Sequence, residues 1–161
     1  MRSKSNIRRR HWLAWIALCP VLALHVLDEA VTDFLGIYNP VFHAIRERQP
    51  LLILPTFSFN IWLSLLIFAV IALAGASVFV WKGRWAMRPI SYVFAAVMLT
   101  NGLLHIAHSI YLRKLMPGVY TSPLLLAASI VLVASTRAHK RASANMGRRD
   151  AAIHRSCGAR R

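Results

Sequence analysis

Four long apolar stretches separated by short polar segments dominate the sequence, over residues 12–33, 55–81, 89–112 and 122–136. At a rise of about 1.5 Å per residue, the first three are long enough to cross a hydrocarbon core about 30 Å thick. The fourth is shorter, and it can span only if it borrows flanking residues or stands nearly upright. The pattern predicts an all-α fold, a polytopic membrane protein in which residues 12–136 form a four-transmembrane-helix bundle.

Composition and charge agree with this fold and orient it. The 161 residues are 57% hydrophobic, above the share of about 45–50% that is typical of soluble domains. Of the 20 Lys and Arg residues, sixteen lie in segments 1–11, 82–88 and 137–161, which share one face if the chain crosses four times. Because positive loops stay in the cytoplasm, both termini are expected there, in a plasma membrane of the bacterial inner-membrane type.

The basic flanks predict contacts with lipid rather than with nucleic acid, because their charge follows the loops of a membrane protein. We expect segment 1–11, His11 included, and the tail 137–161 to lie against anionic headgroups in the cytoplasm. The tail is low in large apolar residues and is expected to be disordered until it is bound. Between the first two apolar stretches, Asn39 and Pro40 predict the start of a short surface helix.

Ionisable residues inside the spans are the candidates for function, because a charged side chain near a helix centre costs at least about 2.5–3.5 kcal/mol. The first span carries four polar residues on one helical face, at i, i+3, i+4 and i+7: His25, Asp28, Glu29 and Thr32. The third span carries three at i, i+4 and i+7: Asn101, His105 and His108. The second span adds a pair at i and i+4: Asn60 and Ser64.

The depth of these residues in the membrane indicates one shared site. His25 lies 13 residues past Trp12, about 20 Å along an outward-running helix. His105 lies 16 residues past Pro89, about 24 Å along a second outward-running helix. The second span runs inward, so Asn60 is expected near the same level. Two independent spans therefore bring histidines together in the outer half of the bilayer.

Neutral imidazole and carboxylate are ligands for zinc, iron and manganese. Ligands three or four residues apart can bind one ion from a single helix. The spacing predicts a divalent metal held by three histidines and one carboxylate, from the set His25, Asp28, Glu29, His105 and His108. The carboxylate left over would act as a general base, and Asn101 would orient a ligand.

Three short motifs carry a family resemblance: H-V-L-D-E at 25–29, N-G-L-L-H at 101–105 and L-M-P-G-V-Y-T at 115–121. Their order and spacing resemble the HXXEE-motif family, integral membrane proteins with four predicted spans that also carry N-X-X-X-H and Y-X-P-G-X-X-T motifs. Asp28 stands where the family has its first Glu, and Leu115 stands where it has Tyr. The resemblance covers nearly everything except the two termini.

The resemblance implies an enzyme of unassigned reaction, and its third motif adds Thr121 to the candidate catalytic residues Asp28, Glu29 and Asn101. The same segment, around Gly118, also predicts a plain turn and the start of the fourth helix. The leading hypothesis is a metal-dependent membrane enzyme that acts on a lipid or other apolar substrate. Hydrolysis is favoured over oxidation because no reductase domain is fused to the bundle.

Three other functions fit some of the same residues. A proton-coupled transporter or proton relay would use the His and carboxylate side chains to pass protons. A haem b protein would use His25 and His105 as axial ligands. A structural adaptor would work through its basic tail. Separately from these functions, the bundle could pair with itself as a homo-oligomer.

Overall fold

The structure is a computed structural model that describes residues 2–49, 51–52 and 55–138. This part of the chain is all-helical and contains no strand. Its five helices are α1 (Arg2–Val31), α2 (Phe34–Arg48), α3 (Phe59–Trp81), α4 (Met87–Tyr111) and a C-terminal helix, Ser122–Ala138. Each predicted apolar stretch therefore forms a helix, and the predicted all-α fold is confirmed.

Three of the helices are long and apolar enough to cross a membrane: Ser5–Val31 within α1, Phe59–Trp81 and Met87–Tyr111. They indicate an integral membrane protein. The C-terminal helix, Ser122–Ala138, is apolar but shorter than these three. The fourth crossing and the cytoplasmic position of both termini stay predictions.

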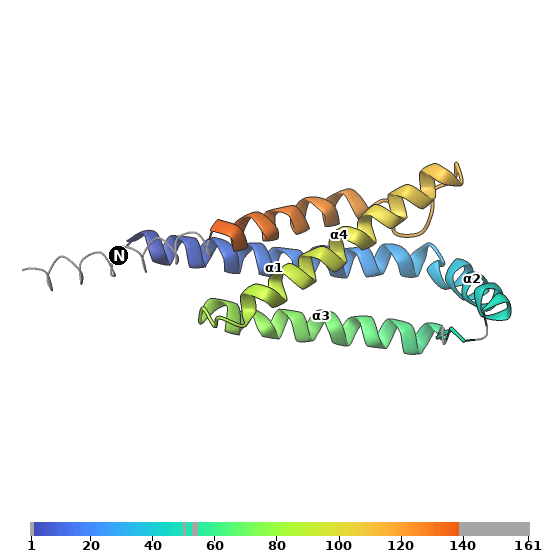
Figure 1. The fold of residues 1–161 in the computed structure, drawn as a ribbon, viewed down its shortest axis with the longest axis horizontal. Helices are drawn as coiled ribbons and strands as arrows, with labels where there is room; N and C mark the ends of the chain where they lie inside the picture. The colour runs from blue at the N-terminus through green and yellow to red at the C-terminus, as the bar shows by residue number, and fades with distance from the viewer. Residues whose placement is uncertain (1, 50, 53–54, 139–161) are drawn as a thin grey trace, which may run out of the picture.

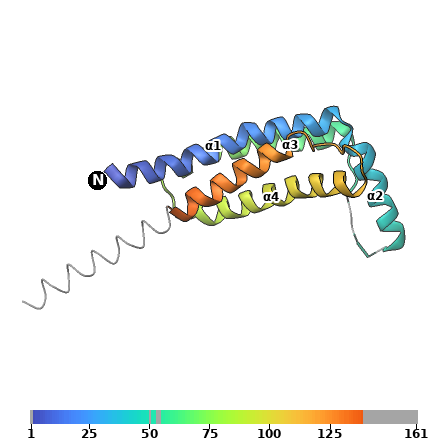
Figure 2. The ribbon, with the colours of Figure 1, turned by 90° about the horizontal axis from the view of Figure 1, so that it is seen from above.

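The long helices run side by side, and α2 lies across one end of the bundle (Figure 1, Figure 2). On α1, the fully buried Trp15 donates an indole hydrogen bond of 2.9 Å to the carbonyl of Leu73 on α3. Leu18 packs in the same core with Leu125 and Leu132 of the C-terminal helix, all fully buried. The core therefore joins α1 to both α3 and the C-terminal helix.

The helices differ from their predicted bounds chiefly at the ends of α1 and α2. α1 begins at Arg2 and not at residue 12, because neither Gly nor Pro interrupts the basic segment. α2 begins at Phe34, where Asp33 adopts a left-handed conformation (φ 57°) and its carboxylate accepts a hydrogen bond from the Gly36 backbone N–H. The surface helix thus exists, but its predicted start at Asn39 was wrong.

Asn39 instead joins two segments of the chain. Its amide nitrogen donates to the carbonyl of Phe57 at 2.9 Å, and its amide oxygen accepts from the Phe57 backbone N–H at 3.2 Å. This pair of hydrogen bonds holds α2 to the residues that lead into α3. The predicted disorder of the basic tail 137–161 is wrong for Arg137 and Ala138, which end the C-terminal helix, and its remaining residues, 139–161, lie outside the described part of the chain.

His11 was expected to belong with the basic flank 1–11, but it packs inside the bundle. The side chain is buried, and its Nε2 lies 2.8 Å from the hydroxyl of Ser91 on α4, which is buried too. That hydroxyl donates to the Met87 carbonyl at 2.7 Å, so His11 Nε2 is the donor to Ser91. The result is a polar tie between α1 and α4, far from the α2 end.

Candidate metal centre

The three residues at the centre of the site come from two helices. His25 and Glu29 lie one turn apart on α1, and His105 faces them from α4. All three are buried, with 0%, 6% and 8% of their surface exposed, respectively. The helical spacing that predicted a shared face on α1 thus brings one imidazole and one carboxylate to the histidine of the N-G-L-L-H motif.

The distances within this group suit a metal ion. Glu29 Oε1 lies 3.0 Å from His105 Nε2 and 3.6 Å from His25 Nε2. One ligand atom from each residue lies within 4.8 Å of the other two. In a tetrahedral zinc site, metal–ligand distances of about 2.0–2.2 Å place ligand atoms about 3.4 Å apart. The two measured distances bracket that value, so the group could hold a divalent ion after small side-chain shifts.

Asp28 does not join this group but supports it through Thr121. One carboxylate oxygen of Asp28 accepts two hydrogen bonds from Thr121, from the backbone N–H at 3.0 Å and from the hydroxyl at 2.9 Å. The Thr121 hydroxyl oxygen also lies 2.8 Å from His25 Nδ1. Asp28, Thr121 and His25 therefore form a continuous hydrogen-bonded chain.

This chain assigns the tautomer of His25. The single proton of the Thr121 hydroxyl is directed to the Asp28 carboxylate, so the hydroxyl oxygen accepts a proton from His25 Nδ1. His25 Nε2 then carries a lone pair and points toward Glu29 and His105. A metal-binding histidine needs this arrangement, with one ring nitrogen donating to an oxygen and the other free to coordinate.

Asn101 completes the surroundings of His25. Its amide nitrogen donates to His25 Nε2 at 3.0 Å. Without an ion, this hydrogen bond satisfies the lone pair that the tautomer leaves on Nε2. Coordination through Nε2 would require the amide of Asn101 to move aside, so Asn101 and a metal ion would be alternative partners of the same atom.

The third motif contributes a turn that packs against both imidazoles. Gly118 adopts φ +79°, and a Cβ at this position would lie 2.9 Å from His105 Cε1 and 3.0 Å from His25 Cε1. Ser122, fully buried, fixes the turn by donating to the Gly118 carbonyl at 2.7 Å. The sequence predicted the turn, but it gave no sign that glycine is required because two rings touch it.

Three predicted candidates lie outside the cluster. His108 is exposed, one turn beyond His105 on α4, and is not among the three residues that could share an ion. Asn60 and Ser64 are exposed on α3. Near the cluster, α3 contributes a buried aromatic residue instead: Trp62 stacks on Phe34 with ring centroids 5.8 Å apart, and Phe34 in turn contacts His105 at 5.9 Å.

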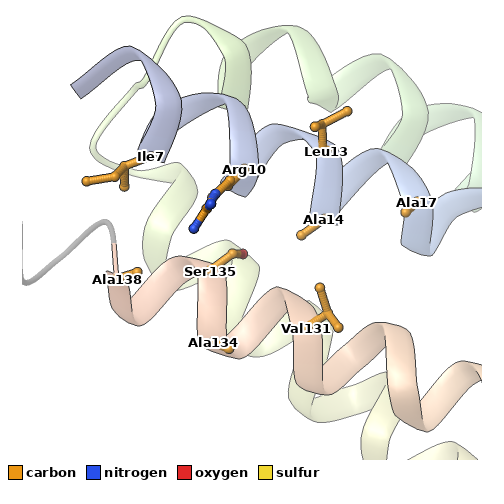
Figure 3. A pocket seen from close by; sticks show the side chains of 9 residues that line it. All are labelled: Ile7, Arg10, Leu13, Ala14, Ala17, Val131, Ala134, Ser135 and Ala138. Atoms are coloured by element: carbon orange, nitrogen blue, oxygen red, sulfur yellow. The ribbon is translucent and has the colours of Figure 1, made fainter. Parts of the chain in front are cut away.

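An apolar cavity of about 350 Å³ adjoins the cluster, between α2 and α4. His105, Asn101 and His108 lie in its wall, and the remaining lining is almost entirely apolar. A second cavity of about 530 Å³ separates α1 from the C-terminal helix at the opposite end (Figure 3). Small residues such as Ala14 and Ala134 line it together with Arg10, so of these two cavities the first is the one that adjoins the cluster.

Comparison with known families agrees with the motif resemblance. A family model described as a protein of unknown function with HXXEE motif matches residues 15–133. The chain belongs to the HXXEE-motif family. The matched part of this HXXEE protein contains the whole cluster, the Thr121 chain and the Gly118 turn. The comparisons with curated proteins and with solved structures gave no match.

Proposed function

We propose that this HXXEE protein is a metal-dependent integral membrane enzyme that acts on a lipid or other apolar substrate. The observation that carries the proposal is a buried group of two histidines and one carboxylate beside an apolar cavity. Two histidines and one carboxylate, with a further position open, are the ligand set of catalytic zinc sites and of non-haem iron sites. Zinc, iron and manganese are the candidate ions.

The protein residues have separate roles in this proposal. Glu29, His25 and His105 would hold a divalent ion, and this ion would act as a Lewis acid toward a carbonyl or phosphoryl oxygen. Asp28 acts through Thr121 to keep the proton on His25 Nδ1, so it is a positioning residue rather than a ligand. The buried, largely apolar surroundings exclude water and strengthen each electrostatic interaction. Hydrolysis is preferred to oxidation.

The proposal also includes the membrane topology. Four crossings would place both termini and most of the basic residues in the cytoplasm, against anionic headgroups. The cluster and α2 would then lie in the outer half of the bilayer. The charge distribution supports this orientation, and the length of the C-terminal helix, Ser122–Ala138, makes it the crossing that depends most on local membrane thickness.

Two alternatives fit the geometry less well. A proton path along α1 would have to join the cluster to the His11–Ser91 tie, about 21 Å away by helix rise. The buried residues between them on α1 are apolar or weakly polar: Ala14, Trp15, Leu18, Cys19 and Leu22. A haem would need space between its axial histidines, whereas the His25 and His105 rings are in edge contact with centroids 4.9 Å apart.

The proposal is tested by elemental analysis of the purified protein and of a matched pair of variants on α4. We expect near-stoichiometric zinc, iron or manganese in the wild type, its loss in His105→Ala, and its retention in His108→Ala. Loss in both variants would return His108 to the ligand set. No metal in the wild type, after chelator-free purification and attempted reloading, would contradict the proposed function.

A further inference from the structure

The cavity between α2 and α4 offers a binding site of definite chemistry beside the cluster. We infer that it binds the hydrocarbon chain of a single-chain amphiphile, and that it holds the polar group of that ligand at His105. The inference adds a ligand class to the proposed function, and any catalytic role of the cavity rests on that function. Binding of the chain is a separate property that can be measured on its own.

The first support is the way in which α2 builds one wall. Its lining residues recur at i, i+3, i+4, i+7 and i+8, which is the apolar stripe of an amphipathic helix: Phe34, Ile37, Tyr38, Val41 and Phe42. On an ordinary amphipathic helix, this apolar stripe would be packed against a neighbouring helix. Here a cavity of about 350 Å³ remains between the stripe and α4. The stripe therefore presents apolar surface to a space large enough for a ligand.

The second support is continuity with the candidate metal centre. His105 and Asn101 line the cavity and also contact the cluster through Glu29 and His25, respectively. Phe34 belongs to the same wall, and its ring packs against His105. A ligand in the cavity would thus touch the residues that surround the proposed ion. The apolar part of such a ligand fits the α2 stripe, and its polar part fits the side of His105.

The size of the cavity favours one chain over two. A water molecule occupies roughly 30 Å³ in the liquid, and a methylene group is of similar size. A volume of about 350 Å³ then holds about twelve carbon atoms in a single chain. The two chains of an ordinary phospholipid would need about twice this space. The cavity also falls at the small end of the range of about 300–1,000 Å³ for small-molecule sites.

The route of entry also fits an amphiphile. Three apolar residues of the lining are about half exposed: Val41 (48%), Leu104 (52%) and Leu112 (51%). The space between α2 and α4 is therefore open toward the surroundings, which are lipid in a membrane-spanning bundle. An amphiphile already dissolved in the bilayer could enter sideways, with its chain first buried against the α2 stripe.

The test uses photo-crosslinking of the full-length protein in phosphatidylcholine nanodiscs. The probe is a twelve-carbon fatty acid that carries a diazirine near the end of its chain. We expect cross-links concentrated on the peptides of α2 and α4 that line the cavity. An excess of unlabelled dodecanoic acid should suppress these cross-links, whereas a phosphatidic acid with two twelve-carbon chains should not. Suppression by both competitors, or labelling spread over all the helices, would overturn the single-chain assignment.

Two adjacent residues on α4 supply a matched pair of variants. Leu103 and Leu104 are each 52% exposed, but Leu104 lines the cavity and Leu103 does not. Leu104→Trp should reduce the cavity cross-links at least about fivefold by filling the space, and Leu103→Trp should leave them unchanged. Ile37→Trp, on the opposite wall, should act as Leu104→Trp does. Equal labelling in all three variants would overturn the inference.

Metal content and thermal unfolding are measured on the same samples. They show that each variant is folded, and they separate the two proposals. Metal binding with unspecific labelling would contradict the chain site and leave the enzyme proposal standing. Cavity-specific labelling in a protein that takes up no metal would support the chain site and contradict the proposed function.

Discussion

The two ends of the bundle each bury a histidine of α1 that contacts a polar group of α4, yet the two contacts differ in chemistry. His11 donates to Ser91, whose hydroxyl donates onward to a carbonyl of its own helix. At the other end, His25 and His105 meet a carboxylate, and a second carboxylate supports them through Thr121. A helix tie needs one donor and one acceptor. The cluster at the α2 end contains more ionisable groups than a hydrogen bond between two helices requires. This excess distinguishes the candidate site from the simple helix contact at the His11 end.

The largest expected effect comes from removing the Glu29 carboxylate, a group that the His11–Ser91 end of the bundle lacks. Glu29→Gln keeps the shape of the side chain but replaces an anionic ligand with a neutral amide. We expect metal affinity to fall more than about 100-fold, beyond the range of about 10–100-fold seen for supporting residues. Titration of the chelator-treated protein with zinc measures this loss. Glu47→Gln, at an exposed position of α2, is the control and should bind as the wild type does.

The Asp28–Thr121–His25 chain should produce the next largest effect. Thr121→Val removes the oxygen that accepts from His25 Nδ1, and Asp28→Ala removes the carboxylate that accepts from the Thr121 hydroxyl, so metal affinity should fall about 10–100-fold in either variant. The double variant should lose little more than one single variant, because both act through the same proton. Thr32→Val is the control, since its hydroxyl bonds only to the Asp28 carbonyl on its own helix. Losses of affinity that add fully in the double variant would contradict the proposed hydrogen-bonded chain.

The turn at Gly118 is expected to affect stability as well as metal binding. A Cβ there would press on both imidazoles and force a strained backbone, at a cost of about 1–3 kcal/mol. Gly118→Ala should lower the midpoint of thermal unfolding and weaken zinc binding together. Gly75→Ala on α3 places its Cβ where no atom lies within 4 Å, so it should be neutral or slightly stabilising. Equal behaviour of the two variants would refute the close packing of the turn.

The smallest effect is expected at the His11–Ser91 end. Ser91→Ala removes one interhelical hydrogen bond, which contributes about 0.6 kcal/mol on average in a membrane protein. Thermal unfolding should shift only slightly, and metal content should stay at the wild-type level. A loss of metal in Ser91→Ala would show that the two ends are coupled, and the contrast between a helix tie and a site would then fail.

The sequence could predict those parts of the site that depend on helix periodicity and depth. His25 and Glu29 share a face because they are one turn apart, and counting residues along two spans brought His105 to the same level. The same reasoning placed His108 with them, although residues three apart differ in direction by about 60° on a helix. The orientation of α4 then leaves His108 at the cavity wall. Depth alone also could not tell which way Asn60 faces.

Long-range contacts account for what the sequence left open. Thr121 bonds to Asp28 across 93 residues of chain, and no local pattern connects them. The need for glycine at 118 depends on two rings that come from α1 and α4. His11 looked like part of a basic flank because its neighbours are arginines, but helix packing buries it against α4. Local composition is a poor guide where the tertiary contact decides.

The double hydrogen bond between Asn39 and the backbone of Phe57 has a mechanical consequence. It clamps the middle of α2 to the chain that leads into α3, so a movement of α2 away from that chain would have to break both hydrogen bonds. Because α3 is the most apolar of the three long helices, its tilt would depend on the thickness of a surrounding bilayer. The clamp would pass a change in that tilt to α2, and the width of the gap between α2 and α4 would then respond to the membrane in which the protein is embedded.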